Sequence, residues 1–161
     1  MSCFITKKSL IRYINDLQRR EEKLSNIGKD IGEATSSGHE TWHDNAQYDI
    51  AINEFKIHNR LLEEAYRDIK DVNVMTYPNT VGNLVILGSR VIFLRDNIKF
   101  DFKIVGFGDG NIEKSRLYYQ TPLAKALLGH RVGDEFDAVV NNKISSFIIK
   151  DVLPIKDADL I

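Results

Sequence analysis

The sequence has little of several features that mark particular classes of protein. Its 161 residues include one cysteine, Cys3, so no disulfide framework can form. The formal net charge is −1, and Lys and Arg never run longer than two, which disfavours direct DNA recognition. No stretch approaches the roughly 20 apolar residues that span a bilayer, and the first residues lack the apolar run of a signal peptide. These absences favour a cytoplasmic protein that makes no contact with membranes.

Two long apolar repeats occupy the first half of the chain. Between Thr6 and Ala34 the heptad positions are Leu10, Leu17, Leu24 and Ile31 on one line, and Tyr13 or Ile14, Ile27 and Ala34 on the other. Between residues 48 and 72 they are Tyr48, Phe55, Leu62 and Ile69, and Ala51 or Ile52, Ala65 or Tyr66, and Val72. Two such seams joined by a short turn are typical of an antiparallel coiled-coil hairpin. We expect residues 1–76 to form this finger, with arms that reach roughly 40 Å at the usual helical rise.

A polar segment, residues 36–48, separates the two repeats. Gly38 suits the end of a helix because glycine takes the left-handed conformation easily, and Thr41 followed by Asp44 matches a capping box that starts another helix. The segment therefore predicts a hairpin turn between Ser37 and Asp44. We expect this polar, acidic and aromatic turn to take part in whatever reaction the protein serves.

The second half of the chain changes from a helical to a strand period. Pro78 cannot continue a helix and marks a linker. Strands are predicted at 88–94, 98–105, 117–119, 136–140 and 146–152, and a short helix at 122–128 that begins with Pro122 and is capped by Gly129. We expect residues 80–161 to form a small antiparallel sheet that packs on this helix. The predicted fold class is α+β in two domains.

Two segments resemble the GreA/GreB family of bacterial transcript cleavage factors. Asp44-Asn45-Ala46-Gln47-Tyr48 is similar to the family's acidic tip, Glu-Asn-Ala-Glu/Asp-Tyr. Residues 121–134, Thr-Pro-Leu-Ala-Lys-Ala-Leu-Leu-Gly-His-Arg-Val-Gly-Asp, are similar to its Ser-Pro-x-x-x-Ala-Leu-Leu-Gly-Lys-x-Val-Gly-Asp segment. The resemblance covers nearly the whole length of the chain.

The resemblance implies a transcription elongation factor whose partner is a bacterial-type RNA polymerase. It implies an FKBP-like second domain that docks on the polymerase through the neighbourhood of Gln120, Thr121 and Pro122, while the coiled coil enters the secondary channel. In the family the tip carboxylates help hold a second Mg²⁺ in the polymerase active site, where backtracked RNA is cut. The factor itself is then no enzyme and has no cofactor of its own. We expect a monomer whose tip meets the 3′ end of the nascent RNA, with weak DNA or RNA contact beyond it.

The tip departs from the family pattern at its first acid. The family's first tip acid falls on Thr41, and the second is retained as Asp44. Glu40 is adjacent and could take the missing place, so Asp44 and Glu40 are the predicted Mg²⁺ ligands. The predicted tip contacts are Thr41, Trp42, His43, Asn45 and Tyr48. The alternative is a non-cleaving factor of the same family that occupies the channel and modulates the polymerase.

Other interpretations of the same residues remain open. His39-Glu40-Thr41-Trp42-His43 matches the H-E-x-x-H pattern of zinc peptidases, and Glu63 follows at the distance of a third ligand. The predicted helix boundary inside this motif speaks against that function. The exposed turn could instead bind a transition metal incidentally, or Asp44 could act only as a capping acid. The FKBP-like resemblance also suggests prolyl isomerase activity. This hypothesis is weak, because a shared fold does not imply a shared activity.

Overall fold

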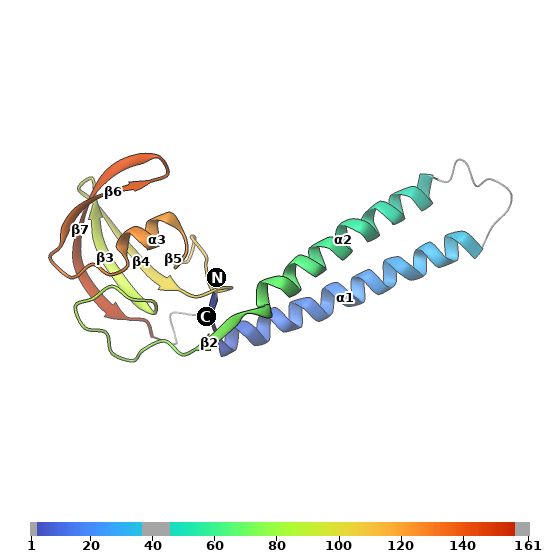
Figure 1. Cartoon of the computed structure of the whole chain (residues 1–161), viewed down its shortest axis with the longest axis horizontal. Helices are drawn as coiled ribbons and strands as arrows, with labels where there is room; N and C mark the ends of the chain where they lie inside the picture. The colour runs from blue at the N-terminus through green and yellow to red at the C-terminus, as the bar shows by residue number, and fades with distance from the viewer. Residues whose placement is uncertain (1–2, 37–45, 157–161) are drawn as a thin grey trace. The chain divides into compact units, whose positions relative to one another are not determined.

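The computed structural model describes residues 3–36 and 46–156 (Figure 1). The chain divides into two compact units. The first comprises Ile11–Val72, and the second combines Cys3–Leu10 with the chain from Asn73 onward. The N-terminal segment is therefore part of the same unit as the second half of the sequence.

The first unit is a pair of antiparallel helices, α1 (Lys7–Ser36, of which Ile11 onward belongs to this unit) and α2 (Ala46–Lys70). Near the start of α1 the Tyr13 hydroxyl donates to the carbonyl oxygen of Ala65 at 3.3 Å, whereas further along α1 Gly28 faces the ring of Phe55. The residue number of the partner on α2 falls as the number on α1 rises, so the helices run in opposite directions, as Figure 1 also shows. This confirms the predicted helical hairpin.

The seam between the helices follows the predicted heptads. Leu17, Leu62 and Ala65 are buried in one cluster, and Tyr13, Leu24 and Ile69 pack against it. At two of the three positions where the heptads allowed either of two residues, Tyr13 and Ala65 face the seam, while Ile14 is 40% exposed and Tyr66 is 43% exposed. The smaller Ala65 on α2 leaves room for Leu17 from α1, which is how knobs fit holes in such seams.

A two-stranded sheet forms from β1 (Cys3–Thr6) and β2 (Val72–Met75). The prediction that Val72 extends the helical seam is wrong, because α2 ends at Lys70. Val72 and Val74 are β-branched and suit a strand, and β1 supplies the partner that a strand needs.

The second unit is built on a five-stranded sheet with the order β5-β4-β3-β7-β6. Its strands are β3 (Ser89–Arg95), β4 (Ile98–Val105), β5 (Arg116–Tyr118), β6 (Glu135–Val140) and β7 (Lys143–Pro154). The β3–β4, β3–β7 and β6–β7 pairs are antiparallel, as predicted. The β4–β5 pair is parallel, which corrects the expectation of an antiparallel sheet for this edge. Residues 106–115 carry the chain back beside β4, so β5 runs in the same direction.

Two tight turns set the register of this sheet. Asp96 and Asn97 link β3 to β4 with φ of 50° and 65°, and Asn141 and Asn142 link β6 to β7 with φ of 54° and 61°. Two successive residues with positive φ match the twist of the flanking strands, and Asn and Asp tolerate this conformation best after glycine. Each hairpin is therefore specified by its own two turn residues.

The helix α3 (Pro122–Leu127) covers one face of the sheet (Figure 1). Its buried residues, Ala124 and Leu127, join Phe93 and Phe147 in the main core cluster. Gly129 follows the helix with a φ of +87°, as its predicted capping role requires. The face of the sheet under α3 is therefore the core face.

Candidate functional site

The predicted tip lies between the two helices of the first unit. α1 ends at Ser36 and α2 begins at Ala46, and the turn predicted between Ser37 and Asp44 lies outside the described residues. The predicted tip residues His39, Glu40, Thr41, Trp42, His43, Asp44 and Asn45 lie outside the described residues, so their roles stay predictions. Of the predicted contacts, Tyr48 is described and lies half-buried in the first turn of α2. Asp49 follows it, where an acid is favoured by the dipole of the helix.

The position of Glu63 argues against the zinc peptidase hypothesis. Glu63 lies 17 residues beyond the start of α2, which places it about 25 Å along the helix from Ala46 at 1.5 Å per residue. His43 is three residues from Ala46, and three residues reach at most about 11 Å. Glu63 accepts a hydrogen bond from the Asn59 side chain at 2.9 Å on an exposed face. Its place far along α2 from the segment that carries the H-E-x-x-H motif therefore argues against Glu63 as a third zinc ligand.

The predicted docking residues form the start of α3 in the second unit. Thr121 caps the helix: its hydroxyl accepts from the backbone N–H of Ala124 at 3.4 Å and donates to the carbonyl oxygen of Tyr118 at 2.8 Å. Pro122 is the first helical residue, where its missing N–H costs no hydrogen bond, and it is exposed. The helix start is therefore a rigid, uncharged and accessible corner.

Gln120 connects this corner to the N-terminal strand. Its amide donates to the Tyr119 hydroxyl at 2.9 Å and lies 3.6 Å from the Cys3 sulfur. The Tyr119 hydroxyl also accepts from the backbone N–H of Phe4 at 3.3 Å, and the two rings lie 6.1 Å apart. All three predicted docking residues are thus held in one neighbourhood, with β1 beside them.

A buried carboxylate in the second unit was not predicted from the sequence. Asp109 is 5% exposed and accepts hydrogen bonds from the hydroxyl groups of Thr6 at 3.2 Å, Tyr77 at 3.1 Å and Ser9. Thr6 also caps the start of α1 by accepting from the Ser9 N–H at 3.2 Å. These bonds tie the N-terminal segment to the loop after β4. The spacing Thr6-x-x-Ser9 before an apolar repeat is the sequence signal of a helix start, but nothing nearby in the sequence points to Asp109.

Tyr77 is the second anchor of this buried group. Its hydroxyl accepts from the backbone N–H of Gly106 at 2.7 Å while it donates to Asp109. Burial raises the pKa of the Tyr77 hydroxyl, and the nearby Asp109 carboxylate adds to the rise. The group therefore joins hydroxyl groups of the N-terminal segment and of Tyr77 to the Asp109 side chain, an arrangement that fixes structure.

Neither a metal cluster nor a membrane-spanning helix is found in the part of the chain that the structure describes. No three His, Cys, Asp or Glu residues converge among residues 3–36 and 46–156. No described helix is both long enough and apolar enough to cross a bilayer.

Comparisons with known proteins give the following similarities. A family model described as "Transcription elongation factor, GreA/GreB, C-term" matches residues 80–154. The chain is 24% identical to a "Transcription elongation factor GreA" of Lachnoclostridium phytofermentans, covering 91% of this chain and 96% of that protein. It is also 24% identical to a GreA of Borreliella burgdorferi over 97% of this chain, which spans 17% of the length of that protein. A crystal structure of GreA factor homolog 1 of Thermus thermophilus matches with 20% identity and a TM-score of 0.45, covering 94% of this chain and 99% of that one.

Proposed function

We propose that this chain, which a GreA/GreB family model matches over residues 80–154, acts as a factor of that family: it binds RNA polymerase and stimulates cleavage of backtracked RNA. The observation that carries the proposal is the family match over residues 80–154, joined to a helical hairpin that leads to an acidic segment. In this proposal the hairpin enters the secondary channel, and the polymerase's own active site does the cutting. The protein is an accessory factor and not a free-standing enzyme.

Asp44 is the residue that we propose to act at the polymerase active site, with Glu40 beside it. Carboxylate oxygens are the protein ligands that Mg²⁺ prefers, and one or two of them are enough for an ion that keeps several waters. An ion held there would activate a water molecule for hydrolysis of the RNA. The role of Asp44 and Glu40 is to supply negative charge and oxygen ligands at the end of the hairpin.

A cleavage assay with a stalled, backtracked elongation complex tests this proposal. Asp44→Ala is expected to lower the cleavage rate by at least about 100-fold, since a misplaced or missing ligand costs that much at such sites. Polymerase binding, measured separately by titration, should not change. Glu54→Ala, which removes an equal charge from an exposed position on α2, is the matched control and should cleave like the unmodified protein. Cleavage that survives both Asp44→Ala and Glu40→Ala would refute the role of the tip carboxylates.

A second candidate function rests on Thr41. This residue stands where the family has its first tip acid, so the tip lacks the charge of that acid. A factor with this tip could occupy the channel and modulate the polymerase without cleavage. Thr41→Asp distinguishes the two functions, because an added carboxylate should increase cleavage and lower the Mg²⁺ concentration that is needed. Tight binding without cleavage in every variant would favour the modulator.

Docking through the start of α3 has its own test. Thr121→Asp keeps the helix cap, since Asp is also a good capping residue, but it adds a charge to an uncharged corner. Combined with Pro122→Ala, it is expected to weaken polymerase binding by about tenfold or more, as a buried unpaired charge does at interfaces. Lys125→Ala, one turn further along α3, serves as the control. Unchanged affinity in the double variant would place the docking surface elsewhere.

A further inference from the structure

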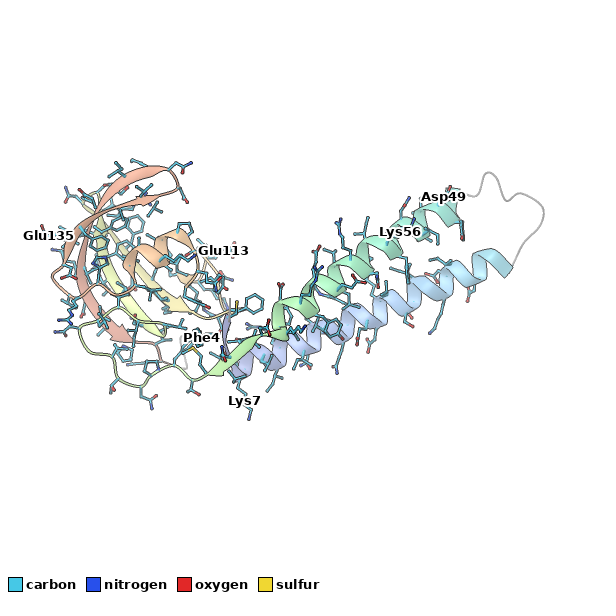
Figure 2. All side chains as sticks on the ribbon, in the orientation of Figure 1. Phe4, Lys7, Asp49, Lys56, Glu113 and Glu135 are labelled. Carbon is cyan, nitrogen blue, oxygen red and sulfur yellow. The ribbon has the colours of Figure 1, made fainter. Side chains whose placement is uncertain are left out.

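The strand β1 places a large aromatic side chain on the surface of the second unit. Phe4, which Figure 2 labels, is 40% exposed, and the next residue, Ile5, is fully buried. The carbonyl oxygen of Phe4 accepts from the backbone N–H of Phe107 at 2.8 Å, and the N–H of Phe4 donates to the Tyr119 hydroxyl at 3.3 Å. Both backbone polar groups of Phe4 are therefore held, so its ring is presented on a fixed strand.

A glycine in the loop after β4 allows β1 to lie this close. A side chain on Gly106 would bring its Cβ within 2.7 Å of the Phe4 carbonyl oxygen, which is too short for a real contact. The Gly106 N–H donates to the buried Tyr77 hydroxyl at 2.7 Å, so this point of the loop is itself fixed. The strand β1 is therefore an integral part of the second unit.

Phe4 belongs to a row of four aromatic rings. Its ring centroid lies 6.1 Å from that of Tyr119, the Tyr119 centroid lies 5.1 Å from that of Tyr118, and the Tyr118 centroid lies 6.2 Å from that of Phe107. Each pair is tilted or edge-on, which is an arrangement that aromatic rings prefer. Tyr119 packs against the main core cluster, so the row connects the core of the second unit to the exposed Phe4 ring.

This row is continuous with the start of α3. The Gln120 amide donates to the Tyr119 hydroxyl at 2.9 Å, and the same hydroxyl accepts from the Phe4 N–H. Residues 3–6, Cys-Phe-Ile-Thr, and residues 118–122, Tyr-Tyr-Gln-Thr-Pro, contain no charged side chain. The cores of protein–protein interfaces are likewise poor in charged residues and rich in aromatic ones. The two segments therefore have the composition of an interface core.

We propose that Phe4, Tyr119, Gln120, Thr121 and Pro122 form one docking surface, the aromatic corner, and that Phe4 is its main apolar contact with RNA polymerase. Phe4 thereby extends the docking surface of the proposed function, on which this assignment rests, from residues 120–122 onto β1. A partner that meets the start of α3 lies beside β1 as well, because the Tyr119 hydroxyl joins the two segments. The part of the polymerase that covers the Phe4 ring is an uncharged, apolar segment.

The binding energy at the aromatic corner is expected to come mainly from Phe4. The Gln120 amide and the Tyr119 hydroxyl already bond to each other, so covering them adds little. Single exposed apolar residues are normal on a protein surface, but Phe4 differs because its backbone is already ordered and its ring borders the proposed docking residues. A ring on a fixed strand loses little conformational freedom on binding, and aromatic rings bury a large area at interfaces.

Titration of RNA polymerase with the full chain tests the role of Phe4. Phe4→Ala is expected to raise the dissociation constant by about tenfold, as loss of a central aromatic contact does at interfaces, whereas Phe4→Tyr keeps the ring and should stay within about twofold. Ile98→Ala is the matched control. Ile98 is 62% exposed at the start of β4, about 24 Å at 3.4 Å per residue from Val105, which pairs with Tyr118. The control should bind like the unmodified protein.

Two further measurements separate a contact from a structural role. In the cleavage assay, Phe4→Ala should need a higher concentration for half of the maximal rate but reach the same rate at saturation, because the predicted tip is unchanged. Benzoylphenylalanine placed at position 4 should form a light-induced crosslink to a polymerase subunit. The same analogue at position 98 should form none.

Unchanged affinity of Phe4→Ala, without a crosslink from position 4, would overturn the role of Phe4, while binding by the unmodified chain would leave the proposed function intact. Equal loss of affinity in Phe4→Ala and Phe4→Tyr, again without a crosslink, would assign Phe4 a structural role and also overturn the proposal. A crosslink between two copies of the chain would show that a second copy covers the aromatic corner instead. Absence of polymerase binding by the unmodified chain would reject the proposed function and this docking surface together.

Discussion

The two units of this protein bury their side chains in different ways. In the described part of the helical hairpin the buried cluster has three members, Leu17, Leu62 and Ala65, whereas the main cluster of the sheet unit has eleven. Each seam residue of the hairpin is covered by one partner helix only. The core residues of the sheet are covered by neighbouring strands and by α3. The hairpin therefore depends on local helix formation along its whole length, while the sheet unit depends on contacts between distant parts of the chain.

The largest effect is expected from the sheet core. Phe93 is fully buried, and its ring lies 5.6 to 6.3 Å from the rings of Phe100, Phe102 and Phe147. Phe93→Ala should lower the free energy of unfolding by about 3–5 kcal/mol, because the cavity cannot close among three fixed rings. Urea unfolding followed by amide NMR signals from each unit would measure this. If the sheet signals of Phe93→Ala persist to the same urea concentration as in the unmodified protein, Phe93 does not pack tightly in the core.

The hairpin seam should be less sensitive. Leu17 is 3% exposed, and Leu17→Ala should lower the free energy of unfolding by about 2 kcal/mol, the lower end for such changes, since a cavity in a two-helix seam opens to water. The same NMR-detected titration should show loss of the α1 and α2 signals before those of the sheet. Ile14→Ala, at the neighbouring exposed position, is the control and should cost little more than a few tenths of a kcal/mol. A larger loss for Leu17→Ala than for Phe93→Ala would reverse the comparison.

The same tyrosine substitution can be made in both units. Tyr77→Phe in the sheet unit removes the donor to Asp109 and the acceptor for Gly106 N–H, and should cost about 1–3 kcal/mol because a buried donor is left without its partner. Tyr66→Phe in the hairpin removes an exposed hydrogen bond to Glu21 and should cost less than about 0.5 kcal/mol. Equal losses of stability for the two variants in thermal unfolding would mean that the contribution of a tyrosine hydroxyl does not depend on its burial.

The Tyr77 hydroxyl also predicts a pH dependence at alkaline pH. Because burial raises the pKa of Tyr77 above its ordinary value of 10.0, the folded protein holds this proton more tightly than the unfolded chain. Its contribution to stability is therefore present below pH 10.0 and falls as the pH rises above that value. Tyr77→Phe should lose less stability than the unmodified protein between pH 9 and pH 11 in urea titrations. If the free energy of unfolding changes with pH by the same amount in the two proteins, the buried position of the Tyr77 hydroxyl is contradicted.

The smallest effect is expected at an ion pair on the face of the five-stranded sheet that α3 does not cover. Arg90 Nε lies 2.8 Å from Asp101 Oδ1, and this hydrogen bond holds the pKa of Asp101 below its ordinary value of 3.8. The stabilisation is present above pH 3.8 and is lost as the pH falls through the folded-state pKa. Both side chains are more than a third exposed, so solvent screening should limit the effect of Asp101→Asn to about 0.5 kcal/mol at pH 7. The difference from the unmodified protein should vanish near pH 2 in thermal unfolding.

Much of the fold could be predicted because its signals are local. The heptads predicted both helices, and Thr121, Pro122 and Gly129 marked the ends of α3 within a residue or two. The turns at Asp96-Asn97 and after Val140 lie where the alternating strands stop. The acidic segment between the helices was also evident, although its residues lie outside the described structure and their roles stay predictions.

The remaining features depend on residues far apart in the sequence. The four residues of β1 have no periodicity that could be recognised, and their partner β2 lies nearly 70 residues further on. Val72 continues the heptad in the sequence but is a strand residue in the fold, because that pairing is available. The parallel direction of β5 depends on the path of residues 106–115, where no pattern is present.

The amino-acid sequence alone determined the helices, the turns between the β-strands, the cap of α3 and the family resemblance. Each of these depends on residues that are close together in the sequence. The tertiary structure alone decided that Asp109 meets Thr6, Ser9 and Tyr77, and that β5 lies parallel to β4. A buried carboxylate requires donors from several segments at once, and the direction of an edge strand is set by the path of the chain that precedes it. Neither property is encoded in the spacing of neighbouring residues.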